Sequence, residues 1–434
     1  MEIKMSKWTS SEPSSLVSAF LKRPAFDASA EEAARGILED IRLNGDAAVL
    51  KYVQDFDGVA LRPDEFRVTP AEFAAARERV DADFRAAARE SHRRVTTFAR
   101  AGMRKDWSIF TSKGGTLGEQ FVALDRVGIY VPGGQAPLVS TVIMTVTLAK
   151  VAGVPEIVVC TPCRGTGQLN PHLLFALELA GATEVYKVGG VQAVGMLAYG
   201  TKTVRKVQKI AGPGGAYVTA AKRLVYGDCA LDLVAGPSEI AIMADETAPA
   251  ECVAADLLSQ AEHGTGFEKA LLVTTFPPLA LAVREQLIRQ AESLSRRAAI
   301  LKVLEKGTLI VTVNTLDEAM DLCNQFAPEH LEILVREPRN WLRKVKAAGG
   351  VFIGIWTPES AGDFVAGPSH VLPTGGTAAM FSGLSVDDFR RRSNFMAFTR
   401  ADLQEALPVI EAFGRVEGLD AHARSARIRF EVGQ

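Results

Sequence analysis

Short apolar runs alternate with longer segments of helical spacing from about residue 122 to residue 376. Several of the runs end in glycine-rich turns, of which the clearest are Pro132-Gly133-Gly134, Gly189-Gly190 and Gly212-Pro213-Gly214-Gly215. Regular repetition of strand, turn and helix is typical of a parallel sheet with helices on its faces. The sequence therefore predicts an α/β fold.

The alternation occurs twice along the chain. Strands are expected first at 127–131, 157–160, 184–188 and 206–210, and then at 239–243, 270–274, 309–313, 331–335 and 351–355. A chain of 434 residues also exceeds what one hydrophobic core usually supports. We therefore expect two related Rossmann-like parallel-sheet domains, with a helical N-terminal region and a small C-terminal tail domain. The expected bounds are 1–121 for the N-terminal region, which can pack with the second α/β half, 122–236 and 237–376 for the two Rossmann-like domains, and 377–434 for the tail.

The charge and apolar content of the chain indicate which classes of molecule it can bind. Apolar residues make up 47% of the chain, charged residues 23%, and the formal net charge is −2. Without a basic excess, the chain lacks the electrostatic footprint of proteins that bind nucleic acid or anionic membranes. Residues 1–8 carry no apolar stretch, and the most apolar segment, 140–160, is interrupted by Lys150 and Pro155. Five cysteines, an odd number in a large chain, fit reduced thiols. We expect a soluble, cytoplasmic protein that acts on a small molecule.

Two of the cysteines form a CxxC motif at Cys160 and Cys163, directly after an expected strand. Such spacing occurs in redox sites and in zinc sites with two such motifs. The chain has no second CxxC, and a strand-end loop with proline and glycine is an adequate structural explanation. We favour that explanation.

Four of the six histidines lie in short segments rich in carboxylates or other ligand side chains. These segments contain Gln260 with His263, Glu329 with His330, Asp363 with His370, and Glu417 with His422. Imidazole and carboxylate together form transition-metal sites or proton relays near neutral pH. Each segment also has a purely structural explanation, such as a histidine at the negative end of a helix dipole. Together they favour one convergent site.

Local spacing adds detail to these segments. Gln260 and His263, at i and i+3 near the end of an expected helix, share one helical face. Glu329 and His330 enter an expected strand and can act as acid–base groups. Asp363 lies in an expected loop beyond strand 351–355, where parallel sheets place ligands. The glycine-rich turns offer free amides for phosphate, but none matches the GxGxxG fingerprint.

Taken together, these segments resemble the histidinol dehydrogenase family. The resemblance runs in consistent order from about residue 30 to residue 425. It rests on 128–134 (GIYVPGG), 189–193 (GGVQA), 209–214 (KIAGPG), 235–239 (AGPSE), 257–264 (LLSQAEHG), 327–331 (APEHL), 359–363 (ESAGD), 370–375 (HVLPTG) and 417–422 (EGLDAH).

The resemblance implies a zinc- and NAD-dependent enzyme that oxidises the amino alcohol L-histidinol to L-histidine through histidinal, in two hydride transfers. It implies metal ligands at Gln260, His263, Asp363 and His422, the last from the exchanged tail of the second subunit in a homodimer. His330 then resembles the general base, and Glu329 the residue that activates water. Substrate contacts are implied at Ser238, His370 and Glu417, as well as at His330 and the four ligand positions. The NAD contacts are implied at Tyr130, Gln192 and the position of Gly215.

Three positions depart from the family pattern. Gly215 and Ser369 stand where the family usually has asparagine, and the segment 377–379 lacks a common arginine. These departures bear on cofactor affinity and on the identity of the substrate. One alternative is therefore a paralogue that oxidises another primary alcohol, such as a sulfonated diol, with NAD. A degenerate binding protein is opposed by the intact Glu329–His330 pair. A zinc hydrolase is opposed by four committed ligands, which leave no position for an activated water.

Overall fold

The computed structural model describes residues 3–12, 14–23, 28–133, 137–165, 167–234 and 236–432. Gly134, at the end of the first glycine-rich turn, and Ala235, at the start of the 235–239 motif, lie outside these residues. The chain divides into two compact units. The first contains 1–102 and 124–389, and the second contains 103–123 and 390–434.

The first unit begins its α/β alternation with a five-stranded parallel sheet in the order β6-β5-β4-β7-β8. Its strands are β4 (Arg126–Tyr130), β5 (Glu156–Cys160), β6 (Glu184–Tyr186), β7 (Lys209–Ala211) and β8 (Ala230–Leu231). The helices between them are α6 (Val139–Ala152), α7 (Pro171–Ala180), α8 (Gly190–Tyr199) and α9 (Ala216–Leu224). The predicted parallel sheet is confirmed, with strand ends shifted by a few residues.

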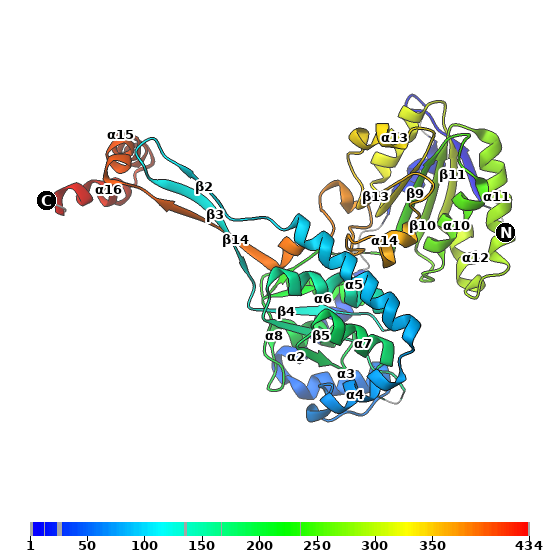
Figure 1. Ribbon diagram of the computed structural model, residues 1–434, viewed down its shortest axis with the longest axis horizontal. Helices are drawn as coiled ribbons and strands as arrows, with labels where there is room; N and C mark the ends of the chain where they lie inside the picture. The colour runs from blue at the N-terminus through cyan, green and yellow to red at the C-terminus, as the bar shows by residue number, and fades with distance from the viewer. Residues whose placement is uncertain are drawn as a thin grey trace. The chain divides into compact units, whose positions relative to one another are not determined.

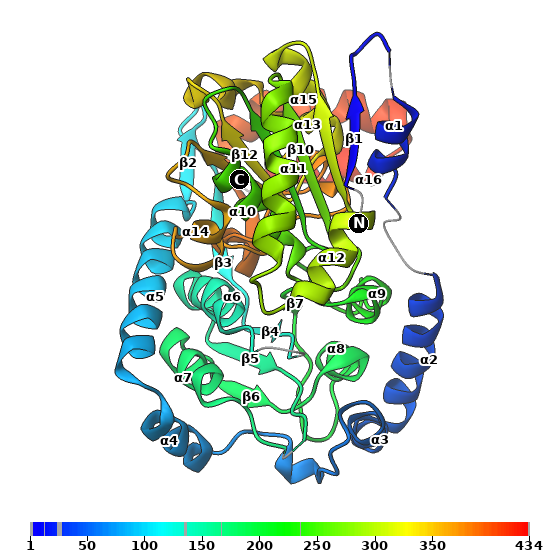
Figure 2. The same ribbon diagram turned by 90° about the vertical axis from the view of Figure 1, so that its right-hand side faces the viewer.

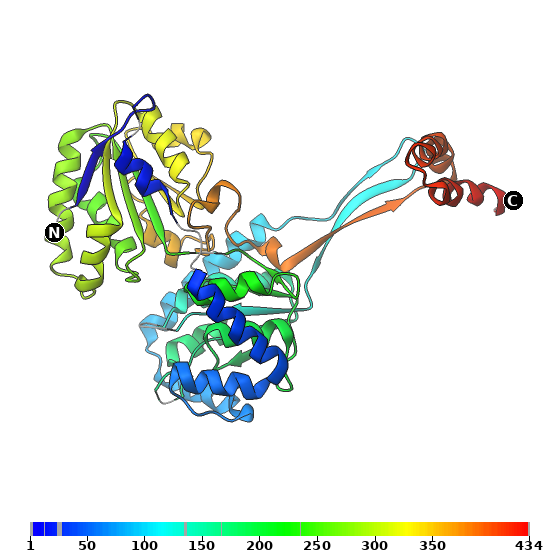
Figure 3. The same ribbon diagram turned by 180° about the vertical axis from the view of Figure 1, so that it is seen from behind.

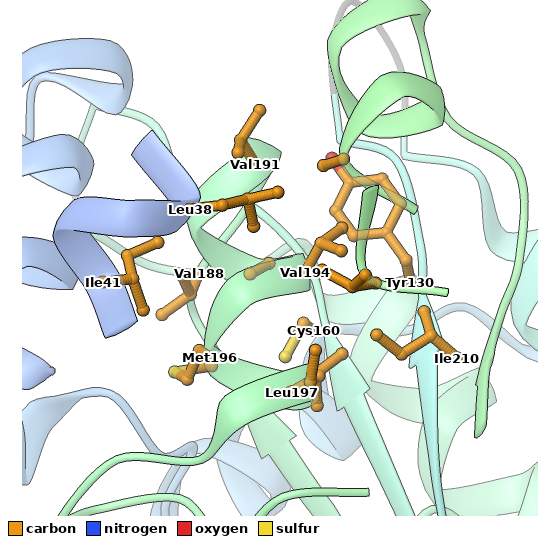
Figure 4. Packing of buried hydrophobic residues seen from close by; sticks show 14 of the residues in the cluster. Leu38, Ile41, Tyr130, Cys160, Val188, Val191, Val194, Met196, Leu197 and Ile210 are labelled. Carbon is orange, nitrogen blue, oxygen red and sulfur yellow. The ribbon is translucent and has the colours of Figure 1, made fainter. Parts of the chain in front are cut away.

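The N-terminal helices pack on both sides of this sheet. They are α2 (Ala28–Asn44), α3 (Asp46–Asp57), α4 (Pro70–Arg79) and α5 (Ala82–Gly102). Helices α2 and α3 lie against α8 and α9, whereas α4 and α5 lie against α7 and α6 (Figure 2). Leu38 and Ile41 of α2 face one side of α8, and Tyr130 and Ile210 from the sheet lie on the other side of that helix (Figure 4). The apolar stripe of α2 therefore completes the core of the first Rossmann-like domain.

The CxxC motif belongs to this core. Cys160 ends β5 and is fully buried, and the Cys163 thiol donates a hydrogen bond to the carbonyl of Lys187. Burial raises the pKa of both thiols, that of Cys163 to about 11. Protonated, enclosed thiols are poor nucleophiles and poor metal ligands. The structure supports the structural explanation of this motif.

The second sheet has six parallel strands in the order β1-β11-β10-β9-β12-β13. The strands are β1 (Lys4–Lys7), β9 (Glu239–Ala244), β10 (Lys269–Thr274), β11 (Thr308–Thr312), β12 (His330–Leu334) and β13 (Gly350–Ile353). Strand β1, which the sequence pattern did not indicate, forms the edge next to β11 (Figure 3). The N-terminal region is thus divided, since β1 and α1 (Ser15–Leu21) join this sheet and the later helices join the first one.

Successive side chains along these strands point to opposite faces of the sheet, and each face belongs to its own hydrophobic core. Ile240, Ile242 and Leu272 face α10 (Ala250–Ala261), α11 (Pro277–Ala291) and α12 (Arg297–Lys306). Leu331 and Ile333 face the opposite core with α13 (Leu316–Phe326). A short helix, α14 (Glu359–Phe364), follows β13 and contacts α10. The two predicted Rossmann-like sheets are therefore both present.

The second unit is built from two distant parts of the chain. Strands β2 (Trp107–Phe110), β3 (Thr116–Ala123) and β14 (Arg390–Ala397) form an antiparallel ribbon in the order β14-β3-β2 (Figure 1). Helices α15 (Arg400–Glu417) and α16 (Asp420–Val432) complete the unit and pack on each other. Among all helices in the described ranges, none is both long enough and apolar enough to span a membrane.

Candidate active site

The histidine and carboxylate segments of the first unit meet at the amino end of the six-stranded sheet. His330 is the first residue of β12 and lies beside Ile240 of β9 and Gly350 of β13. The prediction that Asp363 lies in a loop at the carboxyl end of a strand is wrong. Asp363 belongs to α14, and its Oδ1 lies 3.9 Å from His330 Nε2. The reason is that α10 runs antiparallel to the strands, so its C-terminal half, on which α14 packs, returns to their amino ends.

The contacts of the His330 ring define its tautomer. Nδ1 lies 3.1 Å from the backbone oxygen of Glu239 and 2.9 Å from Oε1 of Gln260. Carbonyl oxygens only accept hydrogen bonds, so Nδ1 carries the proton. Nε2 has no hydrogen-bond partner among the described residues, and it lies 3.9 Å from Asp363 Oδ1 and 4.0 Å from Glu359 Oε1. Burial lowers the pKa of His330 to about 3, so its ring is neutral at neutral pH.

Glu329 lies beside this histidine, although the two residues are consecutive on an extended segment. Its Oε2 accepts a hydrogen bond of 3.0 Å from the backbone amide of Glu239 and lies 3.8 Å from His330 Nδ1. Burial raises the pKa of Glu329 well above its usual range, and the nearby carboxylate of Asp363 raises it further. One backbone unit, that of Glu239, therefore holds both Glu329 and His330.

Glu239 itself is anchored from the N-terminal segment. Its buried carboxylate forms an ion pair of 2.5 Å with Arg23, whose guanidinium also donates to the carbonyl of Phe326 and stacks on that ring. No feature of the local sequence around Arg23 indicates this contact, because the two partners are more than two hundred residues apart.

A second carboxylate joins Asp363 on α14. Glu359 begins the helix, and the i, i+4 spacing puts both carboxylates on one face. His330, Glu359 and Asp363 offer ligand atoms that all lie within 4.8 Å of one another. Burial raises the pKa of Glu359 to about 8 and that of Asp363 to about 6. Glu359 was missed in the sequence reading, and its spacing from Asp363 was the signal that could have identified it.

The donor set suits a zinc ion. Gln260 is fully buried with its Oε1 directed at the site, and Glu359 Oε1 has no hydrogen-bond donor among the described residues. Oxygen and imidazole ligands of this kind are those that zinc accepts. His263 is exposed just beyond α10 and lies close enough to His330 and Glu359 to influence the pKa of both. These residues therefore fit a metal site.

His370 lies against Asp363. Its Nδ1 donates to the backbone oxygen of Asp363 at 3.1 Å, and its Nε2 lies 3.2 Å from the hydroxyl of Thr141 on α6. The preceding Ser369 donates to the carbonyl of Met144 on the same helix. Serine at this departure from the family pattern thus attaches the loop of His370 to the first Rossmann-like domain. Burial lowers the pKa of His370 to about 4.

The remaining predicted substrate residues lie in different elements. Ser238 directly precedes β9 and is partly exposed. Glu417 is the last residue of α15, and His422 lies in the first turn of α16. Both belong to the second unit, where they line a pocket of about 260 Å³ with apolar side chains of α15.

The residues expected to contact NAD lie at the carboxyl end of the first sheet. Tyr130 ends β4, and its hydroxyl accepts a hydrogen bond of 3.1 Å from the amide of Gly190 at the start of α8. Gln192 is buried on the same helix, and its Oε1 has no donor within the described part of the chain. Gly215 caps α9 with φ −68°, is exposed, and an added Cβ would meet no described atom within 4 Å. Helix N-termini beyond parallel strands are suited to bind a pyrophosphate.

A buried ion pair holds the turn that precedes α9. Lys222 Nζ lies 2.5 Å from Asp232 Oδ1 and donates to the carbonyl of Gly212 at 2.8 Å. Asp232 Oδ2 accepts the amide of Gly212 at 2.8 Å. Gly212 has φ +112°, and a Cβ there would lie 2.2 Å from the carbonyl oxygen of Tyr130, so only glycine fits. Sequence reasoning identified the glycine turn but not the pair that holds it.

Comparison with known proteins agrees with this geometry. The family model of histidinol dehydrogenase matches residues 21–430. The histidinol dehydrogenase of Moorella thermoacetica is 48% identical over 397 residues, covering 92% of this chain and 93% of that protein. That of Geobacillus kaustophilus is 44% identical, covering 95% and 97%. The crystal structure of histidinol dehydrogenase from Elizabethkingia anophelis superposes with a TM-score of 0.94 at 34% identity, covering 99% of this chain and 98% of that one. The chain therefore belongs to the histidinol dehydrogenase family.

Proposed function

We propose that this protein oxidises L-histidinol to L-histidine with NAD, in two successive hydride transfers through the aldehyde histidinal. Family membership supports the reaction class. The observation that carries the proposal is the buried Glu329–His330 pair, which lies beside the oxygen ligands Gln260 and Asp363. A base, a water-activating carboxylate and a metal-type donor set are the three parts that this oxidation needs.

His330 is the proposed general base. Its Nδ1 proton is committed to the oxygens of Glu239 and Gln260, which leaves the lone pair of Nε2 for the alcohol proton. As hydride leaves the carbinol carbon, the ring takes up that proton. The carboxylate of Asp363, whose Oδ1 lies 3.9 Å from Nε2, stabilises the resulting imidazolium.

Glu329 is proposed to act between the two hydride transfers. A burial-raised pKa makes its carboxylate a stronger base than an exposed glutamate. In this role it removes a proton from water as the water adds to the aldehyde, and the hydrate then loses the second hydride. The amide of Glu239 keeps the carboxylate oriented by its hydrogen bond to Oε2.

Gln260, His263 and Asp363, with His422 from the tail of a second copy of the chain, are the proposed zinc ligands. Bound zinc would orient the imidazole and amine of the substrate, so that the alcohol carbon faces the nicotinamide. Ser238, His370 and Glu417 are proposed to contact the substrate. The protein would then act as a homodimer with exchanged tails, in the cytoplasm.

NAD is proposed to bind at the carboxyl end of the first sheet, with Tyr130, Gln192 and the backbone at Gly215 in contact. The buried, unpartnered Oε1 of Gln192 and the N-termini of α8 and α9 support this position. A cofactor held this way needs no GxGxxG motif. Oxidation of a different alcohol, the alternative reading of the sequence, is not favoured, because the relatives named above are histidinol dehydrogenases.

The test is NADH formation by the purified, zinc-loaded protein on L-histidinol. We expect two NADH and one histidine for each histidinol consumed, and a chelator-treated sample serves as the matched control. A zinc-loaded protein that forms no NADH from histidinol would contradict the proposal. One NADH per histidinol, with histidinal as product, would contradict the role of Glu329.

A further inference from the structure

Glu332 is a buried carboxyl in a row of apolar side chains. It is fully buried on β12, two residues after His330, so both side chains point to the same face of the sheet. Its neighbours in register are Ile242 on β9 and Phe352 on β13. A carboxyl at such a position is unfavourable unless it makes specific hydrogen bonds.

Two contacts account for this carboxyl. Its Oε1 accepts a hydrogen bond of 2.7 Å from the backbone amide of Glu359, the first residue of α14. The side chain of Asp256 on α10 lies next to the same carboxyl, and burial together with this neighbour raises the pKa of Glu332. Oε2 of Glu332 has no donor group in the described ranges.

The three elements joined by Glu332 are those that carry the site. Strand β12 begins with His330, and Asp256 lies one turn before Gln260 on α10. Glu359 lies one turn before Asp363 on α14. Ser259 adds a second connection, because its hydroxyl lies 2.8 Å from Glu359 Oε2.

We propose that Glu332, which accepts the backbone amide of Glu359 and lies next to Asp256, is a positioning residue that holds α10 and α14 against β12 and so fixes the distance between Gln260, Asp363 and His330. This inference rests on the proposed function, since it concerns the metal and base site. Helix α14 has only six residues and follows Pro358. So short a helix is not stable by itself, and its first amides need external acceptors. Glu332 supplies one of them from a rigid strand.

The test compares two substitutions of nearly equal size in the full-length protein. Glu332→Gln keeps an oxygen for the amide of Glu359 and gains an amide that can donate to the neighbouring Asp256. Glu332→Met fills the same volume without either contact. We expect Glu332→Met to weaken zinc binding about 10- to 100-fold, as loss of an outer hydrogen bond to a ligand-bearing element usually does. We expect Glu332→Gln to stay within about threefold of wild type.

Zinc affinity is measured by competition with a chromogenic chelator, and KM and kcat for histidinol are recorded alongside. Asp245→Ala is the matched control. Asp245 is a buried carboxylate at the other end of β9 that accepts amides of Thr247 and Arg336, so its loss lowers stability away from the site. We expect this control to leave zinc affinity unchanged. Equal zinc affinity of wild type and Glu332→Met, or equal losses in Glu332→Met and Glu332→Gln, would overturn the proposal.

Asp256 provides a second route if Glu332→Met does not fold. Asp256 is partly exposed on α10, so Asp256→Ala is compatible with the helix, and Asp256→Asn keeps a polar side chain that can donate to Glu332. We expect weaker zinc binding in Asp256→Ala and recovery in Asp256→Asn, whereas equal affinities would overturn the proposal. Wild-type zinc binding and turnover are measured first. A wild type that binds no zinc contradicts the proposed function, and a wild type that binds zinc with an insensitive Glu332 contradicts only this inference.

Discussion

Replacing Lys222 by methionine should destabilise the first Rossmann-like domain and weaken cofactor binding together. The Nζ atom lies 2.5 Å from Asp232 Oδ1, and the two side chains are 3% and 1% exposed. Removal of one partner leaves the other as a buried charge without its counter-ion. Breaking such a pair costs about 3–5 kcal/mol of unfolding free energy. Methionine preserves the packing of the aliphatic part of the side chain, so this cost is mainly electrostatic.

The same substitution releases the turn that precedes α9. Gly212 loses the hydrogen bond from Lys222 to its carbonyl, and its amide then depends on an Asp232 side chain that has lost its partner. One hydrogen bond contributes about 1 kcal/mol net, so the conformation of the turn loses about this much stabilisation. If the turn binds the pyrophosphate of NAD, affinity for NADH should fall about fivefold to tenfold.

Urea unfolding followed by circular dichroism gives the stability, and NADH fluorescence gives the affinity. Arg126→Met is the matched control. Arg126 is buried and ion-paired with Glu156 and Glu184 at the amino ends of the strands, away from the cofactor turns. This control should lose comparable stability and keep its NADH affinity. The double variant Lys222→Met/Asp232→Leu should recover stability without recovering affinity, because no charge remains buried.

Two results would refute this reasoning. Lys222→Met with the stability of wild type would show that the pair contributes nothing net. Equal NADH affinities in Lys222→Met and Arg126→Met would show that the hydrogen bonds that Lys222 and Asp232 make to Gly212 do not affect cofactor binding.

Four further predictions concern the site and the first sheet. His330→Asn should lower kcat about 10²- to 10⁴-fold with zinc content retained, measured by NADH formation and metal analysis. His422→Ala and Asp363→Ala should each be inactive, but mixed subunits should regain roughly a quarter of wild-type activity, since half of randomly paired dimers have one intact site. Gly215→Asn should raise NADH affinity about twofold to tenfold, because its φ of −68° and the open space around it admit a side chain that hydrogen-bonds the cofactor. Glu184→Gln should make stability less sensitive to acid. The hydrogen bond from Arg126 lowers the pKa of Glu184 to about 2. The ionised Glu184 therefore contributes to the unfolding free energy in full above a pH of about 4.5, and this contribution is lost as the pH falls toward 2. The difference in unfolding free energy between wild type and Glu184→Gln should shrink by about 1 kcal/mol from pH 6 to pH 3.5.

Each of these has a clear contrary outcome. Loss of zinc in His330→Asn would mean that the residue holds the metal rather than the alcohol proton. Mixed subunits that stay inactive would exclude exchange of the tail. NADH affinity that is unchanged in Gly215→Asn would remove this position from the cofactor site. A Glu184→Gln variant whose deficit is independent of pH would show that the ion pair does not set the acid response.

Both Rossmann-like sheets could be predicted from the sequence, because the alternation of strand, turn and helix is a local property. Strand β12 and helix α10 follow from the spacing of their own apolar residues. The pairing of Glu329 with His330 and the grouping of Gln260 with His263 are likewise visible within a few residues. The burial of the CxxC motif follows from the apolar strand that precedes it.

The second unit and the edge strand β1 were not predictable in this way. Strand β14 pairs with β3 from Arg390 opposite Ala123 to Ala397 opposite Thr116, and neither strand has a clear apolar alternation. Strand β1 is only four residues long and carries two lysines. Partners so distant in sequence leave no local signal, because their stability comes from backbone pairing across the chain.

The arrangement of the site was decided by the tertiary structure alone. His330 meets Gln260 across 70 residues, and His370 meets Thr141 across 229. The antiparallel return of α10 brings Gln260 to the amino end of β12, and the short α14 adds Glu359 to the carboxylates there. The sequence determined which residue types were available for metal binding and proton transfer. Their distances, tautomers and pKa values depend on burial and on contacts between remote segments, which only the folded chain creates.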